Sequence, residues 1–175
     1  MLRVLFVCTG NICRSPTAER LAAAHGAGIP DFEAHSAGVQ AVIGRPMHPD
    51  SARVLQELGG DPSGFVARQL TPKIAAGADL VITMTREHRN AVLEQAPRQL
   101  HRTFTLIEAA RLVSEFGARE IRDLAGLRSQ LGYDDPADVP DPIGQDADVF
   151  TSVGSMIAEL MPPVMELCRN SPPSA

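Results

Sequence analysis

The chain is predicted to be an α/β protein: a single domain with a doubly wound sheet of four parallel strands and helices on both faces, in a flavodoxin-like three-layer arrangement. Short apolar runs alternate along the sequence with longer segments of helical character. The first run, 2–7, is apolar except for Arg3, as in a strand that is covered on both faces. The 175 residues are enough for one domain with a core of ordinary size.

The first half of the chain follows this alternation. After the strand at 2–7, a helix is predicted where Ser15 precedes Pro16, because a serine hydroxyl caps a helix and proline suits its first turn. This helix is expected to end near residue 24, before two glycines. A strand at 32–36 follows, and then a helix at 49–58 with its apolar side chains on one face and a glycine pair at its end.

The middle of the chain continues the same pattern. The expected order is a connector at 61–72, a helical turn at 73–76, a strand at 79–84, a helix at 86–95, a strand at 103–106 and a helix at 108–116. The strand at 79–84 is the clearest of these because it is an uninterrupted apolar run after Asp79. The helix at 86–95 is expected to stop before Pro97.

The last third of the chain is less regular. Residues 117–146 are polar, acidic and rich in glycine and proline, so we expect mostly loop with a helical piece near 119–127. An amphipathic helix at 149–168 is predicted to be disturbed at Pro162-Pro163. The predicted domain is 1–170, and 171–175 is expected to be a frayed tail.

Composition excludes several classes of protein. Apolar residues make up 44% and charged residues 21% of the chain, as in a globular protein, and the net charge of −5 does not favour nucleic acid as a partner. No run is long and apolar enough for a signal peptide or a membrane span. Three cysteines form no disulfide framework. We therefore expect a cytoplasmic monomer with no membrane partner.

The most informative segment follows the first strand directly and reads Cys-Thr-Gly-Asn-Ile-Cys-Arg-Ser over 8–15. Such a loop before a helix can turn successive backbone N–H groups inward and bind an oxyanion. The same field favours a thiolate, so Cys8 is expected to be nucleophilic at neutral pH. Arg14 adds a planar fork that matches two phosphate oxygens. The predicted phosphate-binding residues are Thr9, Gly10, Asn11, Ile12, Cys13, Arg14 and Ser15.

Within this loop, Asn11 tolerates a left-handed backbone, and Gly10 fits the same need. Ser15 could donate a hydrogen bond to the Cys8 thiolate in addition to capping the helix. In a parallel sheet, ligands bind beyond the carboxyl ends of the strands, and Cys8 lies at such an end.

A general acid is expected in the loop before the last helix. Transfer of a phosphoryl group from an aryl ester leaves an oxyanion that needs a proton. The segment Val139-Pro140-Asp141-Pro142 is distinctive because two prolines stiffen the backbone on either side of one carboxylate. Asp141 is therefore the predicted acid, with Asp138 as the alternative. The histidines lack metal-ligand spacing with the cysteines, so we predict no metal.

The stretch from Val7 to Glu19, with its C-x5-R-S spacing, resembles the signature of the low-molecular-weight protein tyrosine phosphatases. The resemblance covers most of residues 1–115 and 139–168, while 117–138 looks longer than the family needs. It implies a hydrolase that acts on protein phosphotyrosine through a phosphocysteine intermediate and uses no cofactor. The catalytic residues would be Cys8, Arg14 and Asp141.

The resemblance also implies supporting roles. Asn11 would hydrogen-bond Ser36 at the end of the second strand, and Cys13 would form a reversible disulfide with Cys8 that protects it from oxidation. The chain departs from the family where Ile143 follows Asp141-Pro142, since an aromatic residue is usual there. The aromatic residue of the opposite rim would fall near Val42 or Ile43, which are also aliphatic. These departures affect the expected substrate preference.

Four other functions share part of this pattern. A protein-arginine phosphatase on the same scaffold resembles this chain at 79–88 and 104–106, but it carries threonine where this chain has Ile12. An arsenate reductase needs two further cysteines in mid-chain, and residues 14–167 contain none. A non-catalytic phosphate-binding module would be expected to lack the nucleophile, the arginine or the acid. A nucleotide-binding module would need Gly-Lys-Ser/Thr after the loop.

Overall fold

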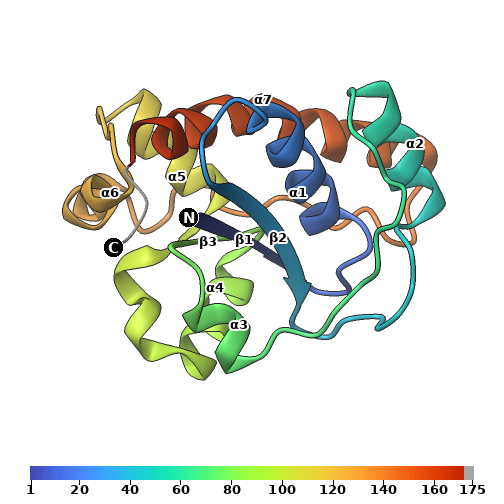
Figure 1. Cartoon of the computed structure of the whole chain (residues 1–175), viewed down its shortest axis with the longest axis horizontal. Coiled ribbons are helices and arrows are strands. Elements are labelled where there is room, and N and C mark those ends of the chain that lie inside the picture. The colour runs from blue at the N-terminus through green and yellow to red at the C-terminus, as the bar shows by residue number, and fades with distance from the viewer. Residues whose placement is uncertain (172–175) are drawn as a thin grey trace.

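Four parallel strands in the order β2-β1-β3-β4 form the centre of the molecule, with helices above and below them (Figure 1). The structure is a computed structural model and describes residues 1–171. The strands are β1 (Leu2–Cys8), β2 (Phe32–Gly38), β3 (Leu80–Thr83) and β4 (Thr103–Thr105). The predicted fold class is confirmed. The tail expected at 171–175 lies, except for Ser171, outside the described residues.

The helices fall into two layers. They are α1 (Arg14–His25), α2 (Pro49–Glu57), α3 (Pro72–Ala76), α4 (Arg86–Gln95), α5 (Leu106–Ser114), α6 (Ile121–Leu127) and α7 (Ala147–Asn170), with 3-10 turns η1 (Pro97–Arg102) and η2 (Arg128–Gln130). Figure 1 shows α1, α5 and α7 on one face of the sheet and α3 and α4 on the other. None of these helices is both long and apolar enough to cross a membrane.

Alternate residues of β1 build the two cores. Leu2, Val4 and Phe6 point into the larger cluster with the side chains of α1, α5 and α7. Leu5 and Val7 point into the smaller cluster under α3 and α4. All five side chains are almost fully buried, which explains why this strand reads as a nearly continuous apolar run.

Three local predictions were wrong. Ser15 does not cap α1, because the helix starts one residue earlier and Cys13 occupies the cap position. Gly10 has no positive φ, whereas Asn11 does, with φ 56°. The last helix continues through Pro162-Pro163 as one element, because the helix on both sides is held by burial of side chains such as Met161 and Val164.

Some boundaries also differ from the predictions. The strand predicted at 103–106 ends one residue early, because Thr105 caps α5 in a reciprocal pair with Glu108. The second strand extends to Gly38. The 3-10 turn η1 was not predicted. The expected helical piece near 119–127 corresponds to α6.

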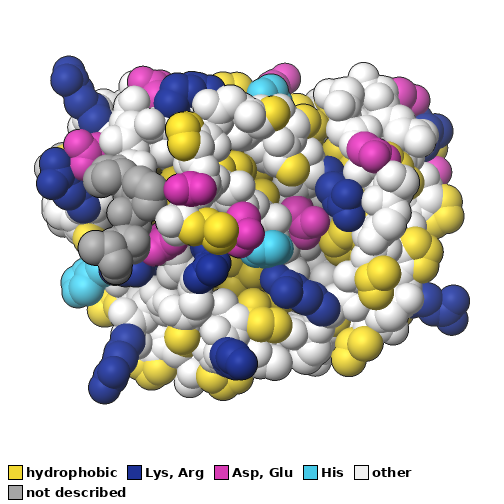
Figure 2. Space-filling view, in the orientation of Figure 1, with side chains coloured by type: hydrophobic (Ala, Val, Ile, Leu, Met, Phe, Trp, Pro, Cys, Tyr) yellow, Lys and Arg dark blue, Asp and Glu magenta, His cyan; other side chains and the backbone are white. Residues whose placement is uncertain are grey.

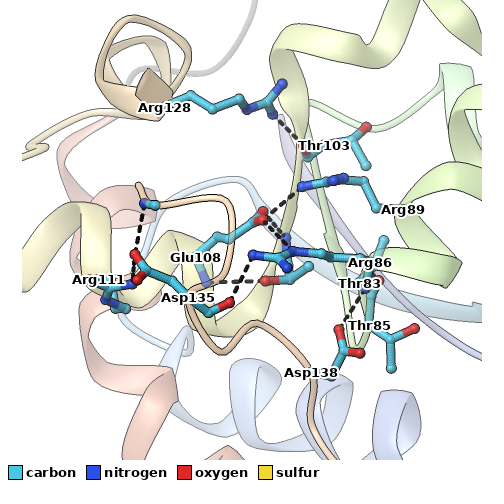
Figure 3. Close-up of polar contacts among 12 residues, drawn as sticks. Thr83, Thr85, Arg86, Arg89, Thr103, Glu108, Arg111, Arg128, Asp135 and Asp138 are labelled. Carbon is cyan, nitrogen blue, oxygen red and sulfur yellow. Dashed lines mark hydrogen bonds and ion pairs between the residues drawn. The ribbon is translucent and has the colours of Figure 1, made fainter. Parts of the chain in front are cut away.

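The segment 117–138, which had no explanation in the sequence, packs against the amino end of β4, against α5 and against the start of α4. The Arg128 guanidinium lies 4.0 Å from the centre of the Phe104 ring and donates to the carbonyl of Thr103. Arg111 forms an ion pair with Asp135 at 2.7 Å (Figure 3). The segment therefore leads the chain back to the sheet immediately before Asp141.

Candidate active site

The predicted nucleophile lies at the carboxyl end of β1, where Cys8 pairs with Gly38 of the edge strand β2. The loop that follows passes close over this glycine: a Cβ atom at Gly38 would lie 2.4 Å from the carbonyl oxygen of Thr9. Only glycine fits at that position. The motif Ser36-Ala37-Gly38 therefore makes room for the loop.

The carbonyl groups of the loop are directed outward. Those of Cys8, Thr9, Gly10 and Ile12 accept hydrogen bonds from backbone amides in the segment 39–48, at 2.8–3.0 Å. Within one peptide unit, the C=O and N–H groups point in opposite directions. The N–H groups that follow these carbonyls consequently face the inside of the loop, as an anion-binding nest requires.

Ser15 contacts Cys8, the predicted nucleophile, directly. Its Oγ lies 2.9 Å from the Cys8 sulfur and 2.9 Å from Asn11 Nδ2. Because an amide nitrogen can only donate, the Ser15 oxygen accepts from Asn11 and keeps its own hydrogen for the sulfur. This geometry directs the Ser15 hydrogen toward the Cys8 sulfur, so the hydroxyl that the sequence predicted as a helix cap is used inside the loop.

Asn11 connects the loop to neighbouring segments and is completely buried. Its Nδ2 also donates to Ser36 Oγ at 2.9 Å, as the family resemblance implied, and its Oδ1 accepts from the backbone amide of Arg68 at 2.9 Å. Ser36 in turn donates to Glu19 at 2.5 Å. Both hydrogens and the oxygen of the Asn11 amide are therefore satisfied, which holds this residue in its left-handed conformation.

Arg14 is buried behind the loop, with its side chain 5% exposed. One nitrogen donates to the carbonyl of Val139 at 2.9 Å, and another lies 3.5 Å from the carboxylate of Asp141. The segment 139–141 is thus held against Arg14 of the loop that begins with Cys8. Asp138 points elsewhere: its carboxylate accepts from the backbone amide of Arg86 at the start of α4 (Figure 3).

A cavity of about 230 Å³ opens above the loop. It is lined by Cys8, Thr9, Gly10, Ile12, Cys13, Arg14, Gln40, Val42, Asp141 and Ile143. Val42 and Ile143 are the exposed aliphatic side chains at its rim, whereas Ile43 is 69% exposed and does not line it. Cys8, Arg14 and Asp141 therefore share one small cavity with an aliphatic wall.

The other two cysteines are buried and are not bonded to each other or to Cys8. Burial raises the pKa of the Cys13 thiol to about 12, and burial does the same for Cys168. Only Cys13 is in the cavity, so only Cys13 is placed to react with Cys8. Among residues 1–171, no group of three or more His, Cys, Asp or Glu side chains could hold a metal ion.

Sequence reasoning missed three residues of this site. Glu19 and Arg68 complete the network around Asn11. His88 of α4 is buried, and its Nε2 lies 2.8 Å from the Thr9 hydroxyl. Glu19 stands inside the matched motif and could have been noticed there. The other two are distant in sequence and carry no local signal.

A cysteine at the start of a loop with inward backbone N–H groups at a strand-to-helix junction, together with an arginine and a carboxylate, is the arrangement typical of cysteine-dependent phosphatases. Residues 3–123 match the family described as low molecular weight phosphotyrosine protein phosphatase. The chain belongs to this family. Figure 2 shows acidic and basic side chains interspersed on one face of the protein.

Relatives span nearly the whole chain. The low molecular weight protein-tyrosine-phosphatase Wzb of Escherichia coli K12 is 30% identical over 154 residues, which are 88% of this chain and 86% of Wzb. The solved structure of a low molecular weight protein tyrosine phosphatase from T. tengcongensis is 32% identical, with a TM-score of 0.75, and the match covers 95% of this chain and 99% of that one. The YwlE arginine phosphatase from Geobacillus stearothermophilus is 29% identical, with a TM-score of 0.74, over 95% and 92% of the two chains.

Proposed function

We propose that this protein hydrolyses phosphotyrosine in proteins, and small aryl phosphates, through residues 8–15 and Asp141 of a domain that spans 1–170. The observation that carries the proposal is the meeting of Arg14 with Asp141, at 3.5 Å, above the loop that begins with Cys8. A phosphoryl group held by this arginine would have the cysteine on one side and the carboxylic acid on the other. That is the geometry of an in-line displacement with a general acid.

In the first step, the Cys8 thiolate attacks phosphorus and forms an S–P bond while the P–O bond to the aryl group breaks. The loop amides and Arg14 hold the three non-bridging oxygens. Asp141, in its acid form, gives its proton to the departing aryl oxygen. The products of this step are the phenol and a phosphocysteine.

In the second step, Asp141 is a carboxylate and takes a proton from water, whose oxygen attacks phosphorus. The S–P bond breaks, inorganic phosphate is released and Cys8 leaves as a thiolate. The Ser15 hydroxyl, 2.9 Å from the sulfur, stabilises that leaving group. The reaction therefore draws on positioning and electrostatic stabilisation by the loop.

Two features of the cavity favour tyrosine over arginine as the phosphorylated residue. Ile12 lines the cavity, and its bulk and lack of a hydroxyl suit an aryl ring better than a polar guanidinium group. Val42 and Ile143 extend the apolar wall. An arginine phosphatase is the second candidate, because YwlE has the same fold over nearly the whole chain.

The test is the hydrolysis of matched phosphotyrosine and phosphoarginine peptides, with para-nitrophenyl phosphate as a third substrate. We expect Cys8→Ser to abolish turnover of the phosphotyrosine peptide and of para-nitrophenyl phosphate, and Asp141→Asn to reduce turnover of the phosphotyrosine peptide strongly. Two matched controls, Cys168→Ser and Asp134→Asn, change another buried cysteine and an exposed acid near Asp141 in sequence. Preference for phosphoarginine would move the assignment to the second candidate. Phosphate binding without any turnover would leave a binding module.

A further inference from the structure

The proposed reaction assigns no role to His88, although this histidine lies against the nucleophile loop. It is 4% exposed, and its Nε2 is 2.8 Å from Oγ1 of Thr9, the residue after the nucleophile. Thr9 also lines the cavity. Within residues 1–171, the hydroxyl of Thr9 makes no other hydrogen bond. The direction of this one bond therefore decides what the hydroxyl can do.

The burial of the second ring nitrogen settles that direction. His88 Nδ1 is buried and has no hydrogen-bond partner among the described residues. If Nδ1 carried the hydrogen, the ring would bury an unpaired N–H donor, and Thr9 would use its own hydrogen on Nε2. If Nε2 carries the hydrogen instead, Nδ1 has only a lone pair without a hydrogen-bond donor. Unpaired buried N–H groups are the rarer of the two cases, so the Nε2–H tautomer is favoured.

The ring is neutral at neutral pH. Burial, followed by the positive charge of Arg14, lowers the pKa of His88 to about 4, while Asp138 and Asp141 act in the opposite direction. A neutral ring with its hydrogen on Nε2 presents a single donor to Thr9. The threonine oxygen then accepts, and its own hydrogen can turn toward another acceptor.

Further hydrogen bonds hold both His88 and Thr9 in place. The His88 backbone amide donates to the Thr85 hydroxyl at 3.1 Å, and Thr83 donates to the Thr85 carbonyl at 2.9 Å. Figure 3 shows Asp138 capping the same turn through the Arg86 amide. On the loop side, the carbonyl of Thr9 accepts from the Gln40 amide at 3.0 Å. The Thr9 hydroxyl is therefore held at one point of the cavity wall.

We propose that His88 is a positioning residue, whose Nε2–H donates to Thr9 so that the Thr9 hydroxyl donates its hydrogen to an oxygen of the phosphoryl group in the loop. Thr9 would then add a side-chain donor to the backbone amides and Arg14. The role in catalysis rests on the proposed function, whereas the tautomer and the binding of inorganic phosphate do not.

The first test is the tautomer of His88 in the wild-type protein, by long-range proton–nitrogen NMR of the imidazole rings, with and without inorganic phosphate. His88→Gln assigns the signals. We expect protonated Nε2 and unprotonated Nδ1 in both conditions at neutral pH. The opposite tautomer, or a doubly protonated ring, in the wild-type protein would overturn the proposal.

The second test measures the inhibition constant of inorganic phosphate, or its dissociation constant if the protein is inactive. Thr9→Val removes the hydroxyl but keeps the shape, and we expect about 10- to 100-fold weaker phosphate binding, as for a hydrogen bond to a charged group. Thr9→Ser should restore most of the affinity. A Thr9→Val protein that binds phosphate within twofold of wild type refutes the donor role.

The coupling of the two residues is tested by His88→Gln, whose amide nitrogen replaces Nε2–H, and His88→Ala, which has no donor. We expect His88→Gln to bind phosphate more tightly than His88→Ala, and His88→Ala to add little loss when Thr9→Val is already present. Additive losses would contradict the coupling. His101→Gln, at an exposed histidine, is the matched control. If the wild-type protein binds phosphate but hydrolyses none of the substrates, the phosphatase function is wrong. The proposed tautomer of His88 and the hydrogen bond from Thr9 to phosphate are still tested by the binding measurements.

Discussion

The guanidinium of Arg14 and the carboxylate of Asp141 come from opposite ends of the chain and lie 3.5 Å apart. The arginine is almost completely buried, whereas the aspartate side chain is 49% exposed. This difference suits the proposed roles, in which a fixed arginine holds the phosphoryl group and an accessible acid faces the incoming substrate. The contact places the two groups so that one phosphoryl ester can touch both.

The substitution Asp141→Asn should slow the hydrolysis of phenyl phosphate by about 100- to 10,000-fold, because the phenolate leaves without a proton. Hydrolysis of para-nitrophenyl phosphate should fall much less, since nitrophenolate is a stable anion. The measurement is kcat across a series of aryl phosphates with leaving groups of increasing pKa. Asp134→Asn should leave the series unchanged. Equal losses for good and poor leaving groups would show that Asp141 is not the acid.

Asn11 should be a large contributor to stability. The substitution Asn11→Ala removes two donated hydrogen bonds and one accepted bond in a buried site and leaves alanine at φ 56°. We expect the free energy of unfolding to fall by about 2–4 kcal/mol. Asn11→Gly loses the same bonds without the backbone strain and should be about 1–2 kcal/mol more stable than Asn11→Ala. Denaturant unfolding measures both, and equal stability of the two variants would contradict the role of the backbone.

Cys13 should make oxidation of the site reversible. Peroxide oxidises the Cys8 thiolate to a sulfenic acid, and attack by Cys13 then forms a disulfide and releases hydroxide. Because burial raises the pKa of Cys13 to about 12, its thiolate fraction, and so the rate of this second step, should rise about tenfold per pH unit between pH 7 and 9. Mass spectrometry of quenched samples follows the disulfide.

The control for this prediction is recovery by dithiothreitol after a peroxide treatment long enough to carry an unprotected sulfenic acid on to sulfinic acid, which dithiothreitol does not reduce. Wild type and Cys168→Ser should recover, whereas Cys13→Ala should not. Equal recovery of Cys13→Ala would show that another thiol or a different chemistry protects Cys8.

His88 should make the protein less stable in acid. Its folded pKa of about 4 lies below the 6.5 of an unperturbed histidine, so between these values the unfolded chain binds more protons than the folded one. Its contribution is fully present above pH 6.5 and is lost as pH falls, by up to about 3 kcal/mol near pH 4. Denaturant unfolding of wild type and His88→Gln at pH 4.5 and 7 measures it. A pH dependence that is unchanged in His88→Gln would contradict this account.

The sequence predicted most of the secondary structure because the signals are local. The buried strands β1 and β3 are apolar runs, and proline or glycine marks the ends of several helices. Predictions failed where two local rules competed. Ser15 precedes a proline and looks like a cap, but its hydroxyl is engaged by Cys8 and Asn11. Pro162-Pro163 breaks a helix in isolation, but α7 is held along its length by burial.

The sequence alone determined which residues make up the loop that begins with Cys8, because the candidate nucleophile, the amides and the arginine are contiguous at a strand-to-helix junction. Tertiary structure decided everything that meets the loop from outside. Which aspartate faces Arg14, why Arg68 supports Asn11, and how His88 reaches Thr9 depend on segments far apart in sequence. The parallel sheet brings these segments to one edge, since its strands all end there. The local pattern of the sequence does not show which distant segments will meet at that edge.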